Sequence, residues 1–201
     1  MSRYRGPRIR IIRRLGELPG LTGRVTKKQN SPGEHGTDRT KQSQYDIRLR
    51  EKQKLRYHYG VTERQLLTLV RRARQSKGAT ASFLLASLES RLDNIIFRIG
   101  YAPTIRASRQ LVTHGHIWVN NKPVNIISFT CQRGDLITIA QRTTSQKLIE
   151  TNLKNNKRPV PPFVRFLLDG KRAQYLQTCP LKDIGLQTRP QLSIEHYYRP
   201  A

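Results

Sequence analysis

The spacing of hydrophobic residues predicts helices through the first half of the chain. Between residues 44 and 59, four side chains can share one buried side of a helix: Tyr45, Leu49, Leu55 and Tyr59. The next helix is expected to begin after Thr62, because Thr62 and Gln65 form the pattern of a capping box. A third apolar stretch covers residues 80–99, with a break expected near Ser90. The N-terminal half is therefore expected to be mainly helical.

The chain before residue 44 is less regular. Pro7 favours the start of a short helix with Ile9, Ile12 and Leu15 on one side. Residues 16–41 are rich in glycine, proline, serine, threonine and asparagine, a composition that is typical of a loop.

The middle of the chain predicts a small mixed module. A helix capped by Thr104 is followed by two strands at 117–119 and 124–126, which a turn at 120–123 joins. A third β-rich segment covers residues 136–140. Together with the preceding helices, these segments predict helices packed on a small antiparallel sheet. The expected fold class is α+β.

The pattern beyond residue 146 is weaker. Residues 155–162 have the composition of an extended linker, and short β-like segments follow at 163–168 and 192–197.

Charge is the dominant feature of the composition. The chain has 201 residues, with 38 Lys and Arg against 13 Asp and Glu, so its formal net charge is +25. Such a charge repels itself unless a polyanion neutralises it, which makes nucleic acid the leading partner and an anionic membrane surface the rival. The positive charge lies on every segment rather than in one helix or tail, which argues against a membrane anchor. No apolar run is long enough to span a bilayer, so we expect no membrane partner.

The sequence carries no signature of catalysis or of a metal site. It contains no glycine-rich phosphate loop, no zinc-protease motif and no nucleophile elbow, so no enzyme activity is expected. Cys131 and Cys179 are too far apart in the chain to resemble a structural zinc site. His35, His114 and His116 could bind a metal, but donation to phosphate or a loop hydrogen bond is the favoured interpretation. We expect no metal and no cofactor.

Basic residues are the candidates for binding RNA. The helix at 44–59 carries five cations and only two acids, Asp46 and Glu51, so pairing within the helix cannot balance them. The ordinary alternative is a solvated cationic face. Arginine prevails near the N-terminus, and its planar guanidinium binds phosphate and stacks on bases, which favours folded RNA. Four nearby tyrosines either stack on bases or pack inward: Tyr4, Tyr45, Tyr57 and Tyr59.

The candidates form three groups along the chain. The N-terminal group is Arg3, Tyr4, Arg5, Arg8, Arg10, Arg13, Arg14 and His35. The group on the helix at 44–59 is Arg48, Arg50, Lys52, Lys54 and Arg56. The group on the mixed module is Arg91, Arg98, Arg106, Arg109, His114, His116 and Lys122.

Motifs in the mixed module resemble a known RNA-binding domain. The run RLDNIIFR at 91–98, the run RQLVTH at 109–114, the pair Val119-Asn120 and Asp135 resemble the αL module of the ribosomal protein S4 family. The module alone is weakly specific, because some RNA-modifying enzymes also carry it.

The flanking segments extend this resemblance to nearly the whole chain. They are MSRYRGP at 1–7, PGEHG at 32–36 and LREKQKLR at 49–56, and each is similar to the ribosomal family itself. The opening of the chain through residue 22 resembles the plastid-encoded branch. Where the family usually has Asn-Gly in its hairpin, this chain has Asn120-Asn121, and the turn is expected to survive because Asn tolerates the left-handed region.

The resemblance implies a fold and a function. A mainly helical domain would consist of residues 1–88, completed by 148–201, with the αL module inserted as residues 89–147. Gln110 and Asn120 would join the RNA-binding candidates. The protein would be a structural constituent of the small ribosomal subunit that binds its rRNA early and nucleates assembly. It would lie where mRNA enters the subunit, beside ribosomal proteins S3 and S5, and contribute to translational accuracy. The implied location is the chloroplast ribosome, with the bacterial cytoplasm as the alternative.

Two other functions stay open at this point. The first is an RNA-modifying enzyme or RNA-binding factor that uses the αL module for targeting, although residues 1–88 and 148–201 offer no catalytic constellation. The second is a peripheral membrane protein that uses its cations on anionic lipid.

Overall fold

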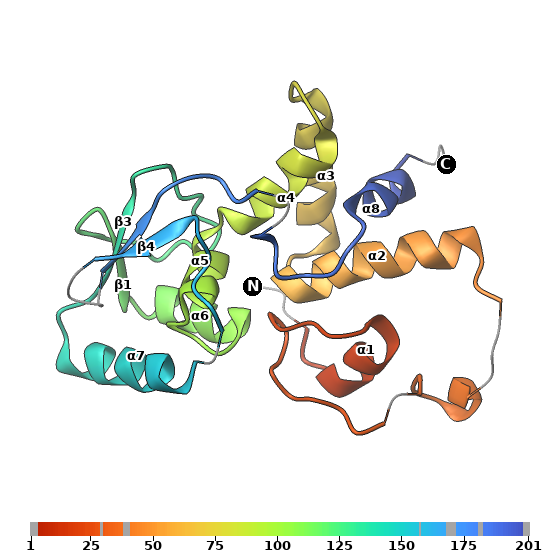
Figure 1. Cartoon of the computed structure of the whole chain (residues 1–201), viewed down its shortest axis with the longest axis horizontal. Coiled ribbons are helices and arrows are strands. Elements are labelled where there is room, and N and C mark those ends of the chain that lie inside the picture. Colours follow the sequence, from red (N-terminus) through yellow and green to blue (C-terminus); the bar gives the residue numbers. More distant parts are fainter. Residues whose placement is uncertain are drawn as a thin grey trace. The chain divides into compact units, whose positions relative to one another are not determined.

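The computed structural model describes residues 4–28, 30–37, 41–156, 158–167, 172–180 and 183–198. The chain forms two compact units, and Figure 1 gives the order of their elements. The helical unit takes its residues from 1–84 and 186–201, and the sheet unit takes residues 85–185. The helix α4 (Thr80–Glu89) carries the chain from the first unit to the second.

The first helix of the helical unit is α1 (Arg8–Leu15), which begins directly after Pro7 as expected. It buries Ile11, Ile12 and Leu15, whereas Ile9 is 41% exposed. The buried side therefore includes Ile11 in place of the expected Ile9, because packing against the next long helix selects the face. The loop that follows contains one short 3-10 turn, η1 (Glu34–Thr37).

The helix α2 (Gln44–Tyr59) confirms the predicted bounds, and α3 (Glu63–Gln75) begins directly after Thr62 as expected. Gly60 ends α2 in the left-handed conformation, with φ of 61°. The capping box of α3 is complete: the Gln65 amide donates to the Thr62 hydroxyl at 3.3 Å, and the Thr62 amide donates to Gln65 Oε1 at 3.1 Å.

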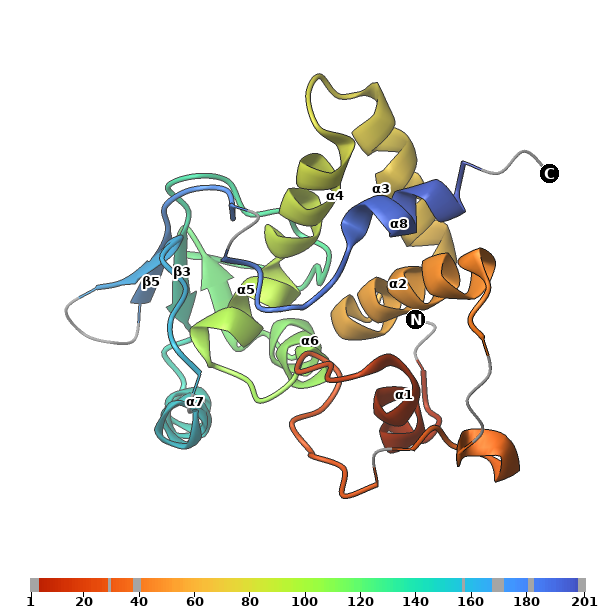
Figure 2. The same ribbon diagram turned by 45° about the vertical axis from the view of Figure 1, so that its right-hand side comes forward.

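The last helix, α8 (Pro190–His196), packs along α2 (Figure 2). The β-like segment expected at 192–197 is therefore wrong. A segment this short has no decisive period of its own, and the burial of Ser193 and Ile194 fixes it as a helix.

The sheet unit begins with the end of α4 and two further helices, α5 (Leu92–Ile99) and α6 (Ile105–Thr113). The expected break near Ser90 is confirmed, because α4 ends at Glu89 and α5 starts at Leu92. Backbone bonds hold the break: the Leu92 amide donates to the Phe129 carbonyl, and the Cys131 amide donates to the Ser90 carbonyl, both at 2.8 Å.

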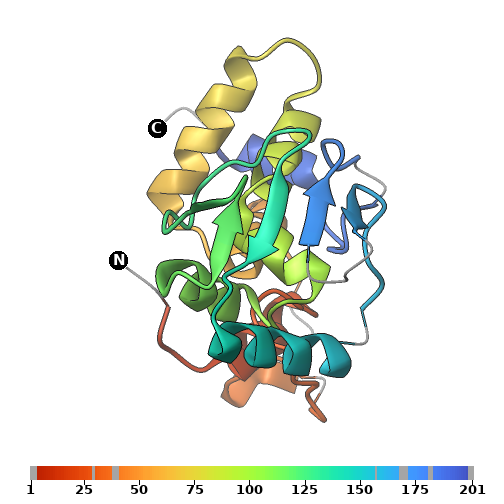
Figure 3. The same ribbon diagram turned by 90° about the vertical axis from the view of Figure 1, so that its left-hand side faces the viewer.

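The described strands form one antiparallel sheet with the order β2-β1-β3-β5-β4 (Figure 3). Its members are β1 (Ile117–Val119), β2 (Lys122–Pro123), β3 (Leu136–Ile139), β4 (Val164–Phe166) and β5 (Arg172–Tyr175). This arrangement confirms the α+β class.

The hairpin between β1 and β2 is tighter than expected. Asn120 and Asn121 both have positive φ, 50° and 61°, which is the two-residue turn that suits a twisted hairpin. Val119 then pairs with Lys122, so the returning strand is 122–123 rather than the expected 124–126.

The C-terminal boundary of the domains differs from the expectation. The sequence assigned 148–201 to the helical domain, but residues 148–185 belong to the sheet unit and only 186–201 return to the helical unit. The reason is that β5 pairs with β3 and β4 pairs with β5, so both late strands belong to the same sheet. The sequence pattern also missed α7 (Thr143–Asn155), which lies across the strand ends in Figure 3.

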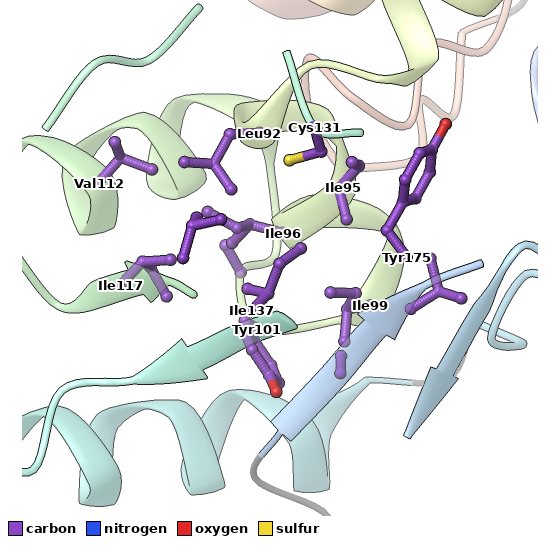
Figure 4. Packing of buried hydrophobic residues seen from close by; sticks show 14 of the residues in the cluster. Leu92, Ile95, Ile96, Ile99, Tyr101, Val112, Ile117, Cys131, Ile137 and Tyr175 are labelled. Carbon is purple, nitrogen blue, oxygen red and sulfur yellow. The ribbon is translucent and has the colours of Figure 1, made fainter. Parts of the chain in front are cut away.

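The core of the sheet unit lies between α5, α6 and the sheet (Figure 4). Ile95, Ile96 and Ile99 of α5 are fully buried there, as are Ile117 and Ile137 of the strands. Burying a side chain of this size contributes roughly 1.5–3 kcal/mol, so α5 and the sheet stabilise each other.

Candidate RNA-binding surface

The cations of α2 are used within the fold more than the sequence suggested. Lys52 Nζ lies 3.0 Å from Glu63 Oε1 of α3, and its side chain is only 9% exposed. Arg48 Nε lies 2.9 Å from Glu195 of α8. Acids from other helices therefore supply the balance that α2 lacks, a possibility that counting charges within the helix could not reveal.

Two other cations of α2 pair within the helix, and Arg56 contacts both its neighbour in α2 and an acid of α3. Arg50 reaches Asp46 at 2.8 Å and Lys54 reaches Glu51 at 2.6 Å. Arg56 lies 3.8 Å from Glu63 and donates to the hydroxyl of the adjacent tyrosine. RNA contact by these side chains stays a prediction, and of the five only Lys52 is buried.

Two glutamates bind the C-terminal segment to α2 and α3. Glu51 Oε2 accepts from the Thr188 hydroxyl at 2.9 Å and from the Arg189 amide at 2.8 Å. Glu63 accepts from the Tyr197 hydroxyl at 2.6 Å. Burial opposes ionisation of both carboxyls, but these hydrogen bonds and the nearby lysines outweigh it, so the pKa of each lies below its ordinary value.

Three arginines of the sheet unit are held by buried acids. Asp93, which is 1% exposed, accepts from Arg91 through both carboxylate oxygens at 3.1 Å and from Arg109 at 2.8 Å. Glu89, which is fully buried, accepts two bonds from Arg98 at 3.0 Å. These arginines hold α4, α5 and α6 together, and their contact with RNA stays a prediction.

Asn120 also has a structural task. Its Nδ2 donates to Asp135 at 2.9 Å, and its Oδ1 accepts from the Leu136 amide at 2.9 Å. These two hydrogen bonds hold the β1–β2 turn against the start of β3. Lys122, the next candidate, is exposed on β2.

The remaining candidates of the sheet unit lie on α6 and just after it. Gln110 and His114 are exposed, and Arg106 is half-buried. The rings of His114 and His116 stack at 6.2 Å, and His116 Nδ1 lies 2.8 Å from the Ser145 hydroxyl. Burial, His114 and Arg142 lower the pKa of His116, so its ring is neutral at pH 7.

The N-terminal candidates gather on and around α1. Arg5, Arg10 and Arg14 are exposed and make no ion pair or hydrogen bond within the described part of the chain. Arg8 approaches the Leu21 carbonyl at 3.5 Å, and Arg13 donates to the Asn30 and Ser31 carbonyls at 2.8 and 3.1 Å. Tyr4 is 40% exposed and meets the Tyr57 ring edge-on at 5.3 Å. His35 is exposed in η1, and Arg3 lies outside the described residues.

An open pocket of about 680 Å³ brings several candidates together. Arg10, Arg13 and Arg14 of α1 line it with Arg50 and Tyr57 of α2. The pocket gathers members of the first two candidate groups around a common space.

Comparison with known proteins now decides the family. Residues 3–89 match the ribosomal protein S4/S9 N-terminal domain, and residues 90–137 match the S4 domain. The small ribosomal subunit protein uS4c of Cyanophora paradoxa is 64% identical over 154 residues, which cover 76% of this chain and 77% of that protein. The uS4 protein of Prochlorococcus marinus strain SARG is 48% identical over 200 residues, 99% of each chain. The uS4c protein of Oltmannsiellopsis viridis is also 48% identical, over 99% of this chain and all of that protein.

The chain belongs to the ribosomal protein S4 family. The resemblance that the motifs indicated is thereby confirmed, and the boundary between the two matches at residues 89 and 90 falls where α4 ends. The family is one of structural ribosomal proteins and not of enzymes. The S4 domain match ends at 137, so α7, β4 and β5 extend the sheet unit beyond it.

Family membership draws attention to cations that the sequence reasoning passed over. Arg64, Arg71 and Arg72 of α3 are exposed and make no ion pair within the described part. Arg64 and Arg71 lie opposite the buried Leu66 and Ala73. The helical period of α3 was a sufficient signal, because it separates these arginines from the apolar side.

Among the described residues no three His, Cys, Asp or Glu side chains gather where they could hold a metal ion. In the same residues no helix has the length and apolar character required to cross a membrane.

Proposed function

We propose that the protein binds small-subunit rRNA as a structural constituent of the small ribosomal subunit. The observation that carries the proposal is the separation of its cations into two classes. Some arginines and lysines form ion pairs that stabilise the fold, as Arg98 does with Glu89. Others stand exposed and make no ion pair within the described residues, and Arg10, Arg14 and Arg71 are examples.

This separation matters because acids are scarce. The chain has only 13 Asp and Glu, and at least six acids in the part of the chain that the structure describes lie in internal ion pairs: Asp46, Glu51, Glu63, Glu89, Asp93 and Glu195. The rest of the surface is left with a large cationic excess. A phosphate backbone is the polyanion that balances such a surface and releases counterions on binding.

Binding to a transcript of small-subunit rRNA tests the proposal. Affinity should fall linearly on a log–log plot against salt, and each lost phosphate contact should reduce the slope by about 0.7–0.9. Replacing both Arg10 and Arg14 with Gln should therefore reduce the slope by roughly 1.4–1.8 without changing stability. If the protein binds unrelated RNA of the same length as tightly as it binds the rRNA transcript, its binding is non-specific and the proposal is rejected.

We also propose a place for the protein in assembly. The protein would bind early and nucleate the subunit, beside S3 and S5. It would lie where mRNA enters and affect translational accuracy. The S4 family motifs at 1–7 and 91–98 support this proposal. Stepwise reconstitution tests this order, because omission of an early binder should prevent the stable incorporation of later proteins. Equal incorporation of S5 with and without this chain would reject it.

The proposed location is the chloroplast ribosome. The relatives named uS4c support it, whereas the cyanobacterial relatives favour the alternative of a bacterial cytoplasm. Detection of the protein in ribosomes from isolated plastids would support the first, and its recovery only from bacterial ribosomes would support the second.

A further inference from the structure

The pocket of the helical unit is lined by polar and aromatic side chains as well as arginines. Binding of phosphate by the arginines alone does not explain these additional side chains. It lies between α1 and α2, which Figures 1 and 2 show beside each other, and the loop at 32–33 closes one side. Its volume of about 680 Å³ falls within the roughly 300–1,000 Å³ typical of pockets that take small ligands. The space is therefore sufficient for one nucleotide.

The wall from α2 is a stripe of one helix face. Asp46, Arg50, Gln53 and Tyr57 follow one another at intervals of three or four residues, so they all face α1. Asp46 and Arg50 pair with each other at 2.8 Å, which leaves this end of the stripe electrically balanced.

Gln53 is the unusual member of the stripe. Its Oε1 is buried and accepts no hydrogen bond among the described residues, and its Nε2 donates none there either. Exchanging the positions of the amide oxygen and nitrogen of Gln53 does not satisfy the oxygen, because neither atom has a hydrogen-bond partner among the described residues. An unsatisfied buried polar group is costly, so a ligand that offers both a donor and an acceptor would be bound favourably.

Tyr57 is held in place before any ligand arrives. Its hydroxyl accepts from Arg56 at 2.9 Å, the Arg56 guanidinium lies 4.7 Å from its ring centre, and Tyr4 meets the ring edge-on. A fixed aromatic side chain contacts a base at a low cost in ordering.

The opposite wall supplies charge. Arg10 and Arg14 lie one turn apart on α1, and neither has a partner in the described part of the chain. Arg13 is occupied with the loop carbonyls and fixes that side of the pocket. A phosphate would be bound by Arg10 and Arg14, while Asp46 is already paired with Arg50.

We propose that this pocket binds one unpaired nucleotide, with its phosphate at Arg10 and Arg14 and its base edge hydrogen-bonded to Gln53 beside Tyr57. The proposal rests on the proposed RNA binding and adds a site to it. An amide offers a donor next to an acceptor, and the Watson–Crick edge of every base offers the complement. The pocket thus distinguishes an unpaired base from a paired one rather than one base from another.

The test uses the full chain and two RNA duplexes that differ at one position. The first carries a single bulged adenosine, and the second has an abasic residue in its place, so both keep the phosphates. Fluorescence anisotropy should show roughly fivefold tighter binding to the bulged duplex, which corresponds to about one hydrogen bond. Equal affinity of the unaltered protein for the two duplexes would overturn the proposal.

Gln53→Met removes both polar ends of the amide while keeping its length. This variant should lose the preference for the bulged duplex, while its unfolding temperature stays equal or rises because the unsatisfied group is gone. Gln75→Met, at an exposed glutamine of α3, is the matched control and should keep the preference. A preference that survives Gln53→Met would reject the role of Gln53, and if that variant fails to fold, the two duplexes still decide with the unaltered protein.

Further binding measurements distinguish a free mononucleotide from a nucleotide within a strand. They also distinguish failure of the pocket proposal from failure of the proposed rRNA binding. Competition by free AMP at low concentration would show that the pocket takes a mononucleotide rather than a nucleotide within a strand. Preferential binding to small-subunit rRNA with equal affinity for the bulged and abasic duplexes would reject the pocket alone. Absence of binding to any of these RNAs would reject the proposed function itself.

Discussion

The Tyr197 hydroxyl donates a 2.6 Å hydrogen bond to Glu63, and this bond ties the end of α8 to the first turn of α3. Burial and the neighbouring carboxylate raise the pKa of Tyr197, so the phenol stays protonated and acts as the donor. Residues 134 positions apart in the chain are joined in this way. The helical unit is therefore closed by contacts that local sequence cannot specify.

Removal of this hydroxyl should weaken the helical unit. We expect Tyr197→Phe to lower the free energy of unfolding by about 1–2 kcal/mol, because Glu63 loses a hydrogen bond to its charged group. Urea denaturation measures the change. Tyr198→Phe is the control, because Tyr198 is 58% exposed and its ring keeps the contact with Arg74. Equal stability of the two variants would show that the bond contributes nothing.

Asp93→Asn should have a larger effect on the sheet unit. Arg91 and Arg109 would both lose their buried counter-charge, and breaking a buried pair in this way costs about 3–5 kcal/mol. The same change at Asp46, whose pair with Arg50 is partly exposed, should cost less than about 1 kcal/mol. Thermal unfolding of both variants compares them, and similar midpoints would contradict the distinction between structural and surface arginines.

Acid should destabilise the helical unit through Glu63. Its pKa in the folded protein lies below the ordinary value of 4.5, so its contribution is fully present above that pH and is lost as the pH falls through the folded value. Urea midpoints measured at decreasing pH should show the loss. Glu63→Gln should start from a lower stability at neutral pH and lose less on acidification. An unchanged pH dependence in that variant would assign the effect to other acids.

The two thiols should be unreactive in the folded protein. Burial raises the pKa of Cys131 and of Cys179 to about 12, so almost no thiolate is present at pH 8. Labelling with an aromatic disulfide reagent should be slow until denaturant is added and rapid afterwards. Fast labelling of the native protein at either cysteine would contradict this expectation.

Local signals explain what the sequence predicted well. The capping box at Thr62 and the left-handed conformation of Asn120 and Asn121 each depend on a few neighbouring residues, and each is confirmed. The helix α8 was mistaken for a strand because its packing on α2, rather than its seven residues, determines its structure.

The candidate site shows the same limit. Sequence placed five cations on α2, but it could not reveal that Glu63 and Glu195 from other helices approach them. Nor could it reveal that Gln53 would be left without a hydrogen-bond partner, since that depends on every neighbour at once. Charge and motif identified the class of ligand, and only the packing separated structural arginines from those that are exposed.

The return of residues 186–198 to the helical unit has a consequence for synthesis. The sheet unit, residues 85–185, is complete before α8 emerges, whereas α2 and α3 must wait for it. At roughly 5–20 residues per second, the hundred or so intervening residues take about 5–20 s to make. During that interval Glu51 and Glu63 lack Thr188 and Tyr197 as partners. The helical unit is thus the last to reach its final structure, although its first 84 residues are the first to be made.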